Sequence, residues 1–208
     1  SVAIAAYYRD RRGIPAANLI HVRFKPGRST LSREEFINLK RRVDRITPKN
    51  IQAYALTWAQ PYRVGCMSIT SAFAFGFDPA FCASNCQPTR PSPYFNSNVA
   101  QPYATYKIRP AMSLAAVSVD EAKKLIDRGV AADGSNPAGT AYLVSTTDKA
   151  RNVRAAGYDL LRARMERIIP TEIIQANALV QKHDVMFYFT GLTHVASLDS
   201  NTFLPGAM

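Results

Sequence analysis

The chain has 208 residues, 47% of them hydrophobic and 20% charged, with a formal net charge of +11. This is the composition of a globular protein, and no apolar run approaches the roughly 20 residues of a transmembrane helix. We expect one domain over residues 1–208, as part of a longer protein that continues beyond both ends.

The positive charge is divided among several segments instead of forming one block. No zinc-finger spacing, RNA-binding aromatic motif or helix-turn-helix pattern accompanies it. We therefore favour a basic solvated surface over nucleic-acid binding. The basic segments are Arg9–Arg12, Arg23–Arg28, Lys40–Arg45 and Lys149–Arg167.

The first half of the chain predicts a strand–helix–strand unit. Ser1–Arg12 is a predicted helix that ends at Gly13, and Leu19–Phe24 is a predicted strand. Ser32 and Glu35 form a capping box that opens a helix with Phe36, Leu39, Val43 and Ile46 on its inner face. Ile51–Trp58 is the next predicted strand, and Ser68–Phe77 a short helix.

Residues 78–110 are rich in proline and aromatic side chains and show no periodicity. Such a long segment inside a compact domain is typical of a lid, a binding loop or a disordered insert. The aromatic residues argue against plain disorder.

The second half alternates predicted helices and strands. A helix begins at Ser118 and ends at Gly129, and Thr140–Thr146 is a buried strand. Ala150–Arg167 is a basic helical stretch, and Glu172–Gln175 is either a short strand or a connection. Ala176–Lys182 is predicted as a short helix. It leads into Val185–Phe189, an apolar run typical of a strand buried on both faces.

Together these elements predict an α/β fold. We expect a mainly parallel sheet with helices on both faces and a long Pro- and aromatic-rich loop, forming an incomplete domain.

Polar residues follow three predicted strands, where ligands bind in open parallel sheets. If one sheet holds all three strands, these groups share an edge, although strand ends are generally polar in any case. The three groups are Thr57–Trp58 with Gln60, Thr146–Asp148, and Thr190 with His194.

His194 is the main catalytic candidate, with Asp148 and Thr190 beside it. A loop histidine can act as a general base because its ordinary pKa is near 6.5, but a surface or hydrogen-bonding role is the alternative. Asp148 either orients His194 or caps the following helix, and we favour the cap. Arg151 and Arg154 either hold an anionic group or belong to a solvated helix face.

The chain has three cysteines. Cys82 and Cys86 are spaced for either a local disulfide or two ordinary thiols, and no histidine lies near them. We therefore predict no metal site, and no motif indicates a cofactor.

Several motifs occur in order along the whole chain. Together they resemble an uncharacterised family of exported bacterial proteins, some of which carry a C-terminal exosortase-type sorting tail. The resemblance implies an exported location, periplasmic, cell-surface or extracellular. The motifs are Tyr7-Tyr8, Arg12–Pro15 with Asn18, Ser92–Asn96, Ile126–Gly129 with Ala132–Gly134, Asp184–Gly191 and Phe203–Ala207.

At the level of fold, Phe187–Gly191 followed by His194 is similar to the histidine-bearing strand of the caspase–gingipain clan of cysteine peptidases. His194 lies three residues after Gly191, whereas the clan places the histidine next to the glycine. The similarity implies a Cys–His hydrolase whose nucleophile lies outside these residues. The alternative is a non-catalytic envelope or extracellular protein that binds a peptide or an envelope component through residues 78–110.

Overall fold

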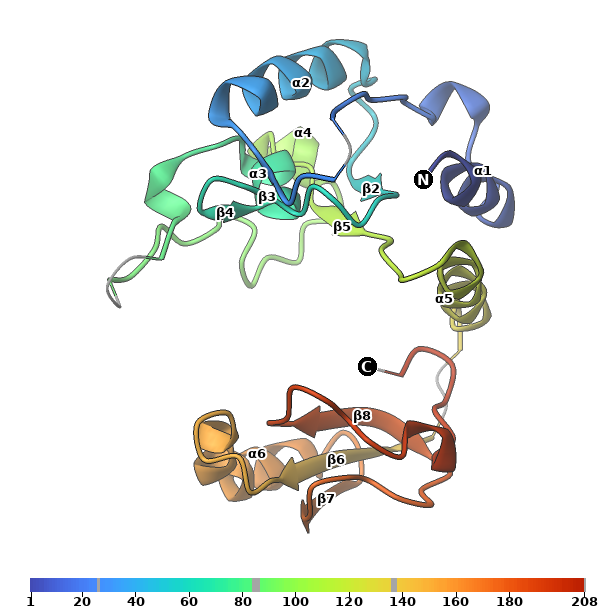
Figure 1. Cartoon of the computed structure of the whole chain (residues 1–208), viewed down its shortest axis with the longest axis vertical. Coiled ribbons are helices and arrows are strands. Elements are labelled where there is room, and N and C mark those ends of the chain that lie inside the picture. Colours follow the sequence, from blue (N-terminus) through green and yellow to red (C-terminus); the bar gives the residue numbers. More distant parts are fainter. Residues whose placement is uncertain (26, 84–86, 136–137, 208) are drawn as a thin grey trace. The chain divides into compact units, whose positions relative to one another are not determined.

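The computed structural model describes residues 1–25, 27–83, 87–135 and 138–207. These residues form a mixed α/β structure with six α-helices and three small sheets, two of them parallel and none closed into a barrel (Figure 1). The α/β class with parallel strands is therefore confirmed, whereas the described strands do not form the single sheet we expected. The chain divides into two compact units, Ser1–Ile126 and Asp127–Met208, called unit 1 and unit 2 below.

Unit 1 contains two of the sheets. In one, β2 and β5 pair in parallel; in the other, β3 pairs in parallel with β1 and antiparallel with β4. The helices are α1 (Val2–Arg11), α2 (Arg33–Ile46), α3 (Ile69–Phe75), α4 (Pro102–Tyr106) and α5 (Val119–Ala131), which continues into unit 2. The strands are β1 (Thr30–Leu31), β2 (Tyr54–Leu56), β3 (Arg63–Val64), β4 (Met67–Ser68) and β5 (Ala111–Ser113). Short 3₁₀ turns are η1 (Ala16–Asn18) and η2 (Pro79–Phe81).

Helix α2 forms as its sequence pattern predicts. The amide of Glu35 donates to Ser32 Oγ at 3.2 Å, and the amide of Ser32 donates to Glu35 Oε2 at 3.0 Å, which completes the capping box. Phe36, Leu39 and Val43 are buried in the core of unit 1. Ile46, expected on the same face, is 57% exposed because the helix ends there and its last turn extends past the core.

The predicted strand over Leu19–Phe24 is not formed. The segment is extended, and its alternate residues Ile20, Val22 and Phe24 pack against the core, but it lies in no β-ladder. Strand β2 is also shorter than predicted, and β5 is its partner. The period-2 pattern therefore indicated the direction of the side chains correctly but not the hydrogen-bonding partner.

The long segment 78–110 contains η2 and α4 and is tied to the core. Phe81 stacks on Phe75 with ring centroids 4.8 Å apart, and Cys82 forms a disulfide with Cys66. The predicted Cys82–Cys86 disulfide is therefore wrong, and Cys86 lies outside the described residues. The reason is tertiary: the tight β3–β4 turn brings Cys66 to η2, with the two Cα atoms 5.6 Å apart.

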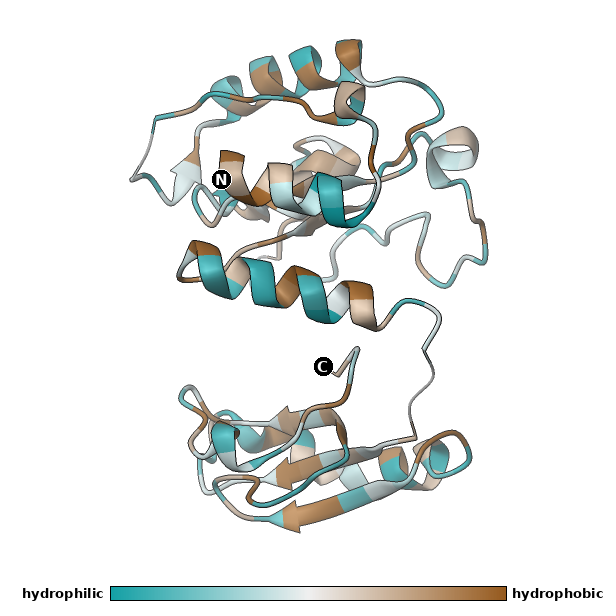
Figure 2. Ribbon diagram, turned by 90° about the vertical axis from the view of Figure 1, so that its right-hand side faces the viewer, coloured by the Kyte–Doolittle hydropathy of each residue, from teal (hydrophilic) through white to brown (hydrophobic). Residues whose placement is uncertain are grey.

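Unit 2 is built on one parallel sheet of order β7-β6-β8. The strands are predominantly hydrophobic (Figure 2), and the central strand β6 is buried over five of its six residues. Strand β8 is an edge strand with Phe189 40% exposed, so the expectation that it is buried on both faces is wrong. The strands are β6 (Thr140–Ser145), β7 (Thr171–Gln175) and β8 (Val185–Thr190).

The helices of unit 2 differ from the sequence prediction. The basic stretch divides into η3 (Asn152–Gly157) and α6 (Tyr158–Met165), and η4 (Leu198–Ser200) follows β8. Helix α5 continues through Gly129, where we expected it to end. No helix forms over 176–182, because the amide of Leu179 donates to the Tyr188 hydroxyl and its carbonyl accepts from Asn201 Nδ2.

Candidate functional site

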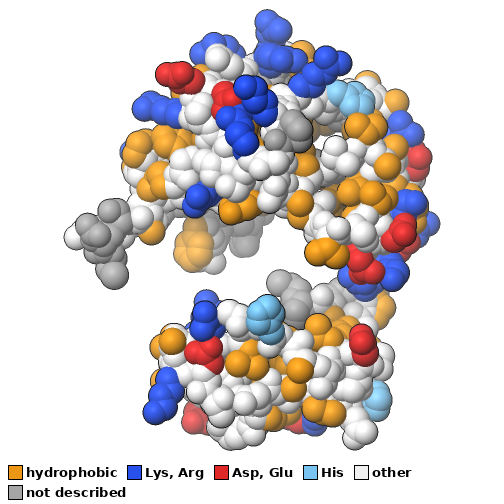
Figure 3. Space-filling view, viewed as in Figure 1, with side chains coloured by type: hydrophobic (Ala, Val, Ile, Leu, Met, Phe, Trp, Pro, Cys, Tyr) orange, Lys and Arg blue, Asp and Glu red, His pale blue; other side chains and the backbone are white. Residues whose placement is uncertain are grey.

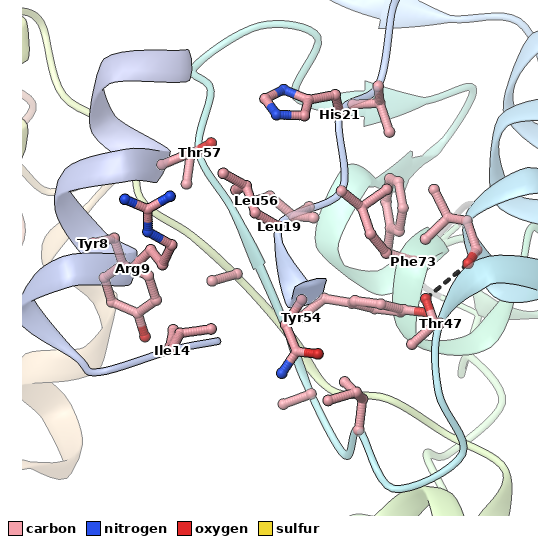
Figure 4. A pocket seen from close by; sticks show the side chains of 18 of the residues that line it. Tyr8, Arg9, Ile14, Leu19, His21, Thr47, Tyr54, Leu56, Thr57 and Phe73 are labelled. Atoms are coloured by element: carbon pink, nitrogen blue, oxygen red, sulfur yellow. Dashed lines mark hydrogen bonds between the residues drawn. The ribbon is translucent and has the colours of Figure 1, made fainter. Parts of the chain in front are cut away.

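A pocket of about 460 Å³ lies in unit 1. Figure 4 shows Tyr8 and Arg9 reaching from α1 into the space in front of Leu19, Leu56 and Thr57, which belong to the 19–24 segment and the β2 region. Pockets of this size, lined mainly by apolar side chains with a few polar groups, are typical of small-molecule sites.

Residues 53–58, which include β2, supply one wall of the pocket, because alternate side chains along this segment differ in size. Tyr54, Leu56 and Trp58 pack against the core, whereas Ala53 and Ala55 are small and exposed, and all five line the pocket. Two small residues leave space beside the strand that larger side chains would fill. The pocket is therefore a direct result of the alternation along this strand.

The charge of the lining is one-sided. Arg9 and His21 line the pocket, and no Asp or Glu does so among the described residues. Arg9 pairs with Asp10 at 2.6 Å at the surface, and its side chain is 31% exposed. Within the lining, the Tyr54 hydroxyl lies 3.1 Å from Thr47 Oγ1, and it lies 3.1 Å from Asp44 Oδ1 as well. Burial raises the pKa of Tyr54. The tyrosine is therefore a neutral polar group there.

Of the two predicted ligand-binding residues near β2, Trp58 lines the pocket and Gln60 does not. Trp58 lines the pocket, and its indole Nε1 donates to the carbonyl of Pro61 at 3.0 Å. Gln60 is exposed and is not part of the lining. Because β2 belongs to another sheet than β6 and β8, these residues do not share the sheet edge of the other two polar groups.

In unit 2, the carboxyl ends of the parallel strands do meet at one edge, and their polar groups bind one another. The Thr146 amide donates to Asn152 Oδ1 at 2.9 Å, and the Thr147 amide and hydroxyl donate to Asn177 Oδ1 at 2.9 and 3.0 Å. Sequence reasoning missed both asparagines, because their partners lie on other loops. Most polar groups of this edge therefore stabilise it.

Two threonine hydroxyls at this edge have no partner. Thr146 Oγ1 and Thr190 Oγ1 are buried and make no hydrogen bond within the described part of the chain. Gly191 follows Thr190, and a Cβ there would lie 2.9 Å from the backbone of Arg151. Glycine therefore lets the end of β8 pack directly against the turn that precedes η3.

No hydrogen bond in the described ranges joins the candidate catalytic residues to one another. His194 is exposed and makes no hydrogen bond or ion pair in the described ranges. Asp148 accepts from the Arg151 amide at 3.1 Å and from Arg151 Nη1 at 2.9 Å, and this guanidinium lowers the pKa of Asp148. Asp148 thus caps the turn before η3, whereas the N-cap residue of η3 itself is Arg151. Arg154 is exposed on η3.

Among the described residues, no three His, Cys, Asp or Glu side chains are grouped so that they could hold a metal ion. None of the helices there has the length and hydrophobicity needed to cross a bilayer.

Comparison of the chain with protein-family models, curated proteins and solved structures found no match.

Proposed function

We propose that this chain is an exported binding protein and that the pocket in unit 1 is its ligand site. The observation that carries the proposal is a pocket of about 460 Å³ between α1 and β2, with no acidic side chain among the described residues that line it. The Cys66–Cys82 disulfide supports export, because disulfides persist mainly in oxidising compartments. The motifs that resemble an exported bacterial family support the same location.

The lining favours an apolar ligand with an acidic group. Leu56, Phe73 and Trp58 offer apolar contact. Arg9 can pair with a carboxylate or sulfonate in exchange for its surface contact with Asp10. A cationic ligand would find no carboxylate in the lining to balance its charge.

Two related dyes test the pocket and its charge preference. 1-Anilinonaphthalene-8-sulfonate carries an acidic group, and N-phenyl-1-naphthylamine is its uncharged counterpart. We expect both to bind the full chain and to quench Trp58, which is the single tryptophan and lines the pocket. Ala55→Phe should abolish binding of both dyes by filling the space beside β2. Arg9→Met should weaken the sulfonate dye about tenfold, since a charged hydrogen bond is lost, and leave the neutral dye unchanged.

Ala104→Phe is the matched control, because Ala104 is exposed on α4 outside the pocket. Equal binding by Ala55→Phe and Ala104→Phe would refute the pocket as the binding site. Equal losses of the two dyes in Arg9→Met would refute only the preference for an acidic ligand.

A hydrolase with His194 as general base is the second candidate. One observation favours it: β6 and β8 are adjacent and parallel, so His194 follows the carboxyl end of a sheet, the place where catalytic loops lie in such folds. His194 is also exposed and free of hydrogen bonds within the described residues. This proposal requires a nucleophile, such as a cysteine, from outside these 208 residues.

The hydrolase proposal is tested with the full-length protein and fluorogenic peptides. His194→Ala should lower turnover at least about 100-fold, the usual contribution of a general base. His183→Ala is the control, because His183 contacts the Thr202 hydroxyl at 3.3 Å instead. Undiminished turnover in His194→Ala would exclude His194 as the base.

A further inference from the structure

The excess positive charge of the chain belongs entirely to unit 1. Residues 1–126 contain 18 lysines and arginines against 7 acidic residues, whereas residues 127–208 contain 8 of each. Unit 2 is therefore formally neutral, and unit 1 carries the whole net charge of +11. The basic segments are spread along the sequence, but the excess positive charge that they produce lies in one of the two units.

Helix α2 carries the most regular part of this charge. Asn38, Arg41, Arg42 and Arg45 lie at positions i, i+3, i+4 and i+7, so they form one stripe along the exposed side of the helix. We call these three arginines the arginine stripe. In Figure 3 the blue side chains gather over α2, at the top of unit 1.

No carboxylate neutralises the stripe within the described residues. Glu35 is paired with Arg28 at 2.6 Å and Asp44 with Lys40 at 2.6 Å. Glu34 lies on the same face of α2, four residues before Asn38, and forms no ion pair with the stripe in the described part of the chain. Arg41 has only a long contact with Asn38 Oδ1 at 3.4 Å, and neither Arg42 nor Arg45 has an ion pair there. Neighbouring like charges destabilise a helix. The helix dipole compensates only Arg45, which lies in the last turn.

The surroundings of the stripe indicate the kind of anion. Arg42 and Arg23 line a pocket of about 250 Å³ beside α2, together with Glu35, whose carboxylate is paired with Arg28. The two arginines can hold a phosphate group between them. The exposed apolar neighbours on the helix are Ile37 and Ile46, which are 36% and 57% exposed. Isoleucine side chains can enter the interfacial region of a bilayer, but they offer nucleic-acid bases no ring to stack on.

From these observations we propose that the arginine stripe of α2 docks unit 1 on an anionic phospholipid surface. The cations bind lipid phosphates, and Ile37 and Ile46 contact the interface between headgroups and acyl chains. This surface is independent of the proposed ligand pocket of about 460 Å³, since none of the three arginines lines that pocket.

The test is cosedimentation of the full chain with vesicles. The wild type should bind vesicles of equal parts phosphatidylcholine and phosphatidylglycerol and should not bind phosphatidylcholine alone. Binding should fall steeply with added salt. The triple variant Arg41→Gln/Arg42→Gln/Arg45→Gln should lower the partition coefficient on the order of 100-fold, because each basic residue near a charged surface contributes about a factor of five.

The matched control is Arg162→Gln/Arg164→Gln/Arg167→Gln, which removes the same charge from exposed positions of unit 2. It should bind like the wild type, and Trp58 fluorescence during denaturation should show that unit 1 is folded in both variants. Equal losses in the two triple variants would overturn the proposal, because net charge alone would then explain binding. A wild type that ignores the anionic vesicles, or binds them regardless of salt, would also overturn it. Stripe-dependent binding to a DNA duplex without vesicle binding would assign the stripe to nucleic acid instead.

Discussion

At the scale of single residues, Asp184 is the polar group that most tightly connects the sheet of unit 2. Its two carboxylate oxygens accept from the Thr140 and Tyr142 hydroxyls, each at 2.6 Å. These hydrogen bonds lower the pKa of Asp184, while burial and the nearby carboxylate raise the pKa of Tyr142. Asp184 lies directly before β8, so its two hydrogen bonds connect the start of β8 to the start of β6.

We expect Asp184→Asn to destabilise unit 2 by about 2 kcal/mol at neutral pH, the usual value for hydrogen bonds to a charged group. Faster amide hydrogen exchange of β6 would report this change. Because the folded pKa of Asp184 is lowered, its contribution is present above the unfolded pKa and lost as the pH falls through the folded pKa. The wild type should therefore lose stability below about pH 4, and the variant should lose less.

Asp199→Asn is the control for this experiment, because Asp199 is exposed on η4 and makes no hydrogen bond through its side chain in the described ranges. Identical exchange rates in the two variants would show that the Asp184 hydrogen bonds do not stabilise the sheet.

Arg109 shows a residue role that sequence reasoning did not find. It is only 4% exposed, its Nε donates to the Ile51 carbonyl at 2.9 Å, and its guanidinium lies 3.3 Å from the ring centroid of Tyr103. Arginine is rarely buried, so a sequence alone assigns it to the surface. Its hydrogen bonds connect the end of the long 78–110 segment to the chain just before β2.

At the scale of elements, α2 is the helix whose beginning was fully predictable. The Arg28 guanidinium and the Ser32 amide lower the pKa of Glu35 to about 2, so the capping box keeps its charge over the ordinary pH range. The signal is local, since donor and acceptor lie within four residues of each other.

Ser32→Ala should destabilise unit 1 by about 1 kcal/mol, because the Glu35 amide loses its acceptor. Ser32→Gly should cost only a few tenths of that, since glycine leaves the amide open to water. Urea denaturation followed by Trp58 fluorescence measures unit 1 alone, because Trp58 is the single tryptophan. If neither substitution destabilised unit 1, the side-chain cap would contribute nothing to its stability.

Strands were harder to place than helices. The apolar run at β8 predicted a central strand, but β6 occupies the centre and β8 the edge. Both runs have the same sequence character, and only pairing with other strands distinguishes centre from edge. The extended 19–24 segment shows the same difficulty, because its inner and outer residues were predictable and its lack of a ladder was not.

At the scale of the whole molecule, the excess positive charge and the two candidate sites are distributed unequally between the two units. Unit 1 holds the pocket, the disulfide and the arginine stripe, whereas unit 2 holds the Asp184 network and the sheet edge with His194. The dye, vesicle and peptide experiments therefore examine different surfaces. The result of one does not determine the result of another.

The sequence by itself determined the α/β class, the start of α2 and the inner faces of most elements. These features depend on residues within a few positions of one another, where propensity and periodicity act directly. Only the tertiary structure decided that Cys82 pairs with Cys66, that β6 is central, and that Arg9 and Ala55 share a pocket. Each of these three features depends on contacts between residues that are distant in sequence. Their proximity depends on how whole elements pack, which no local pattern encodes.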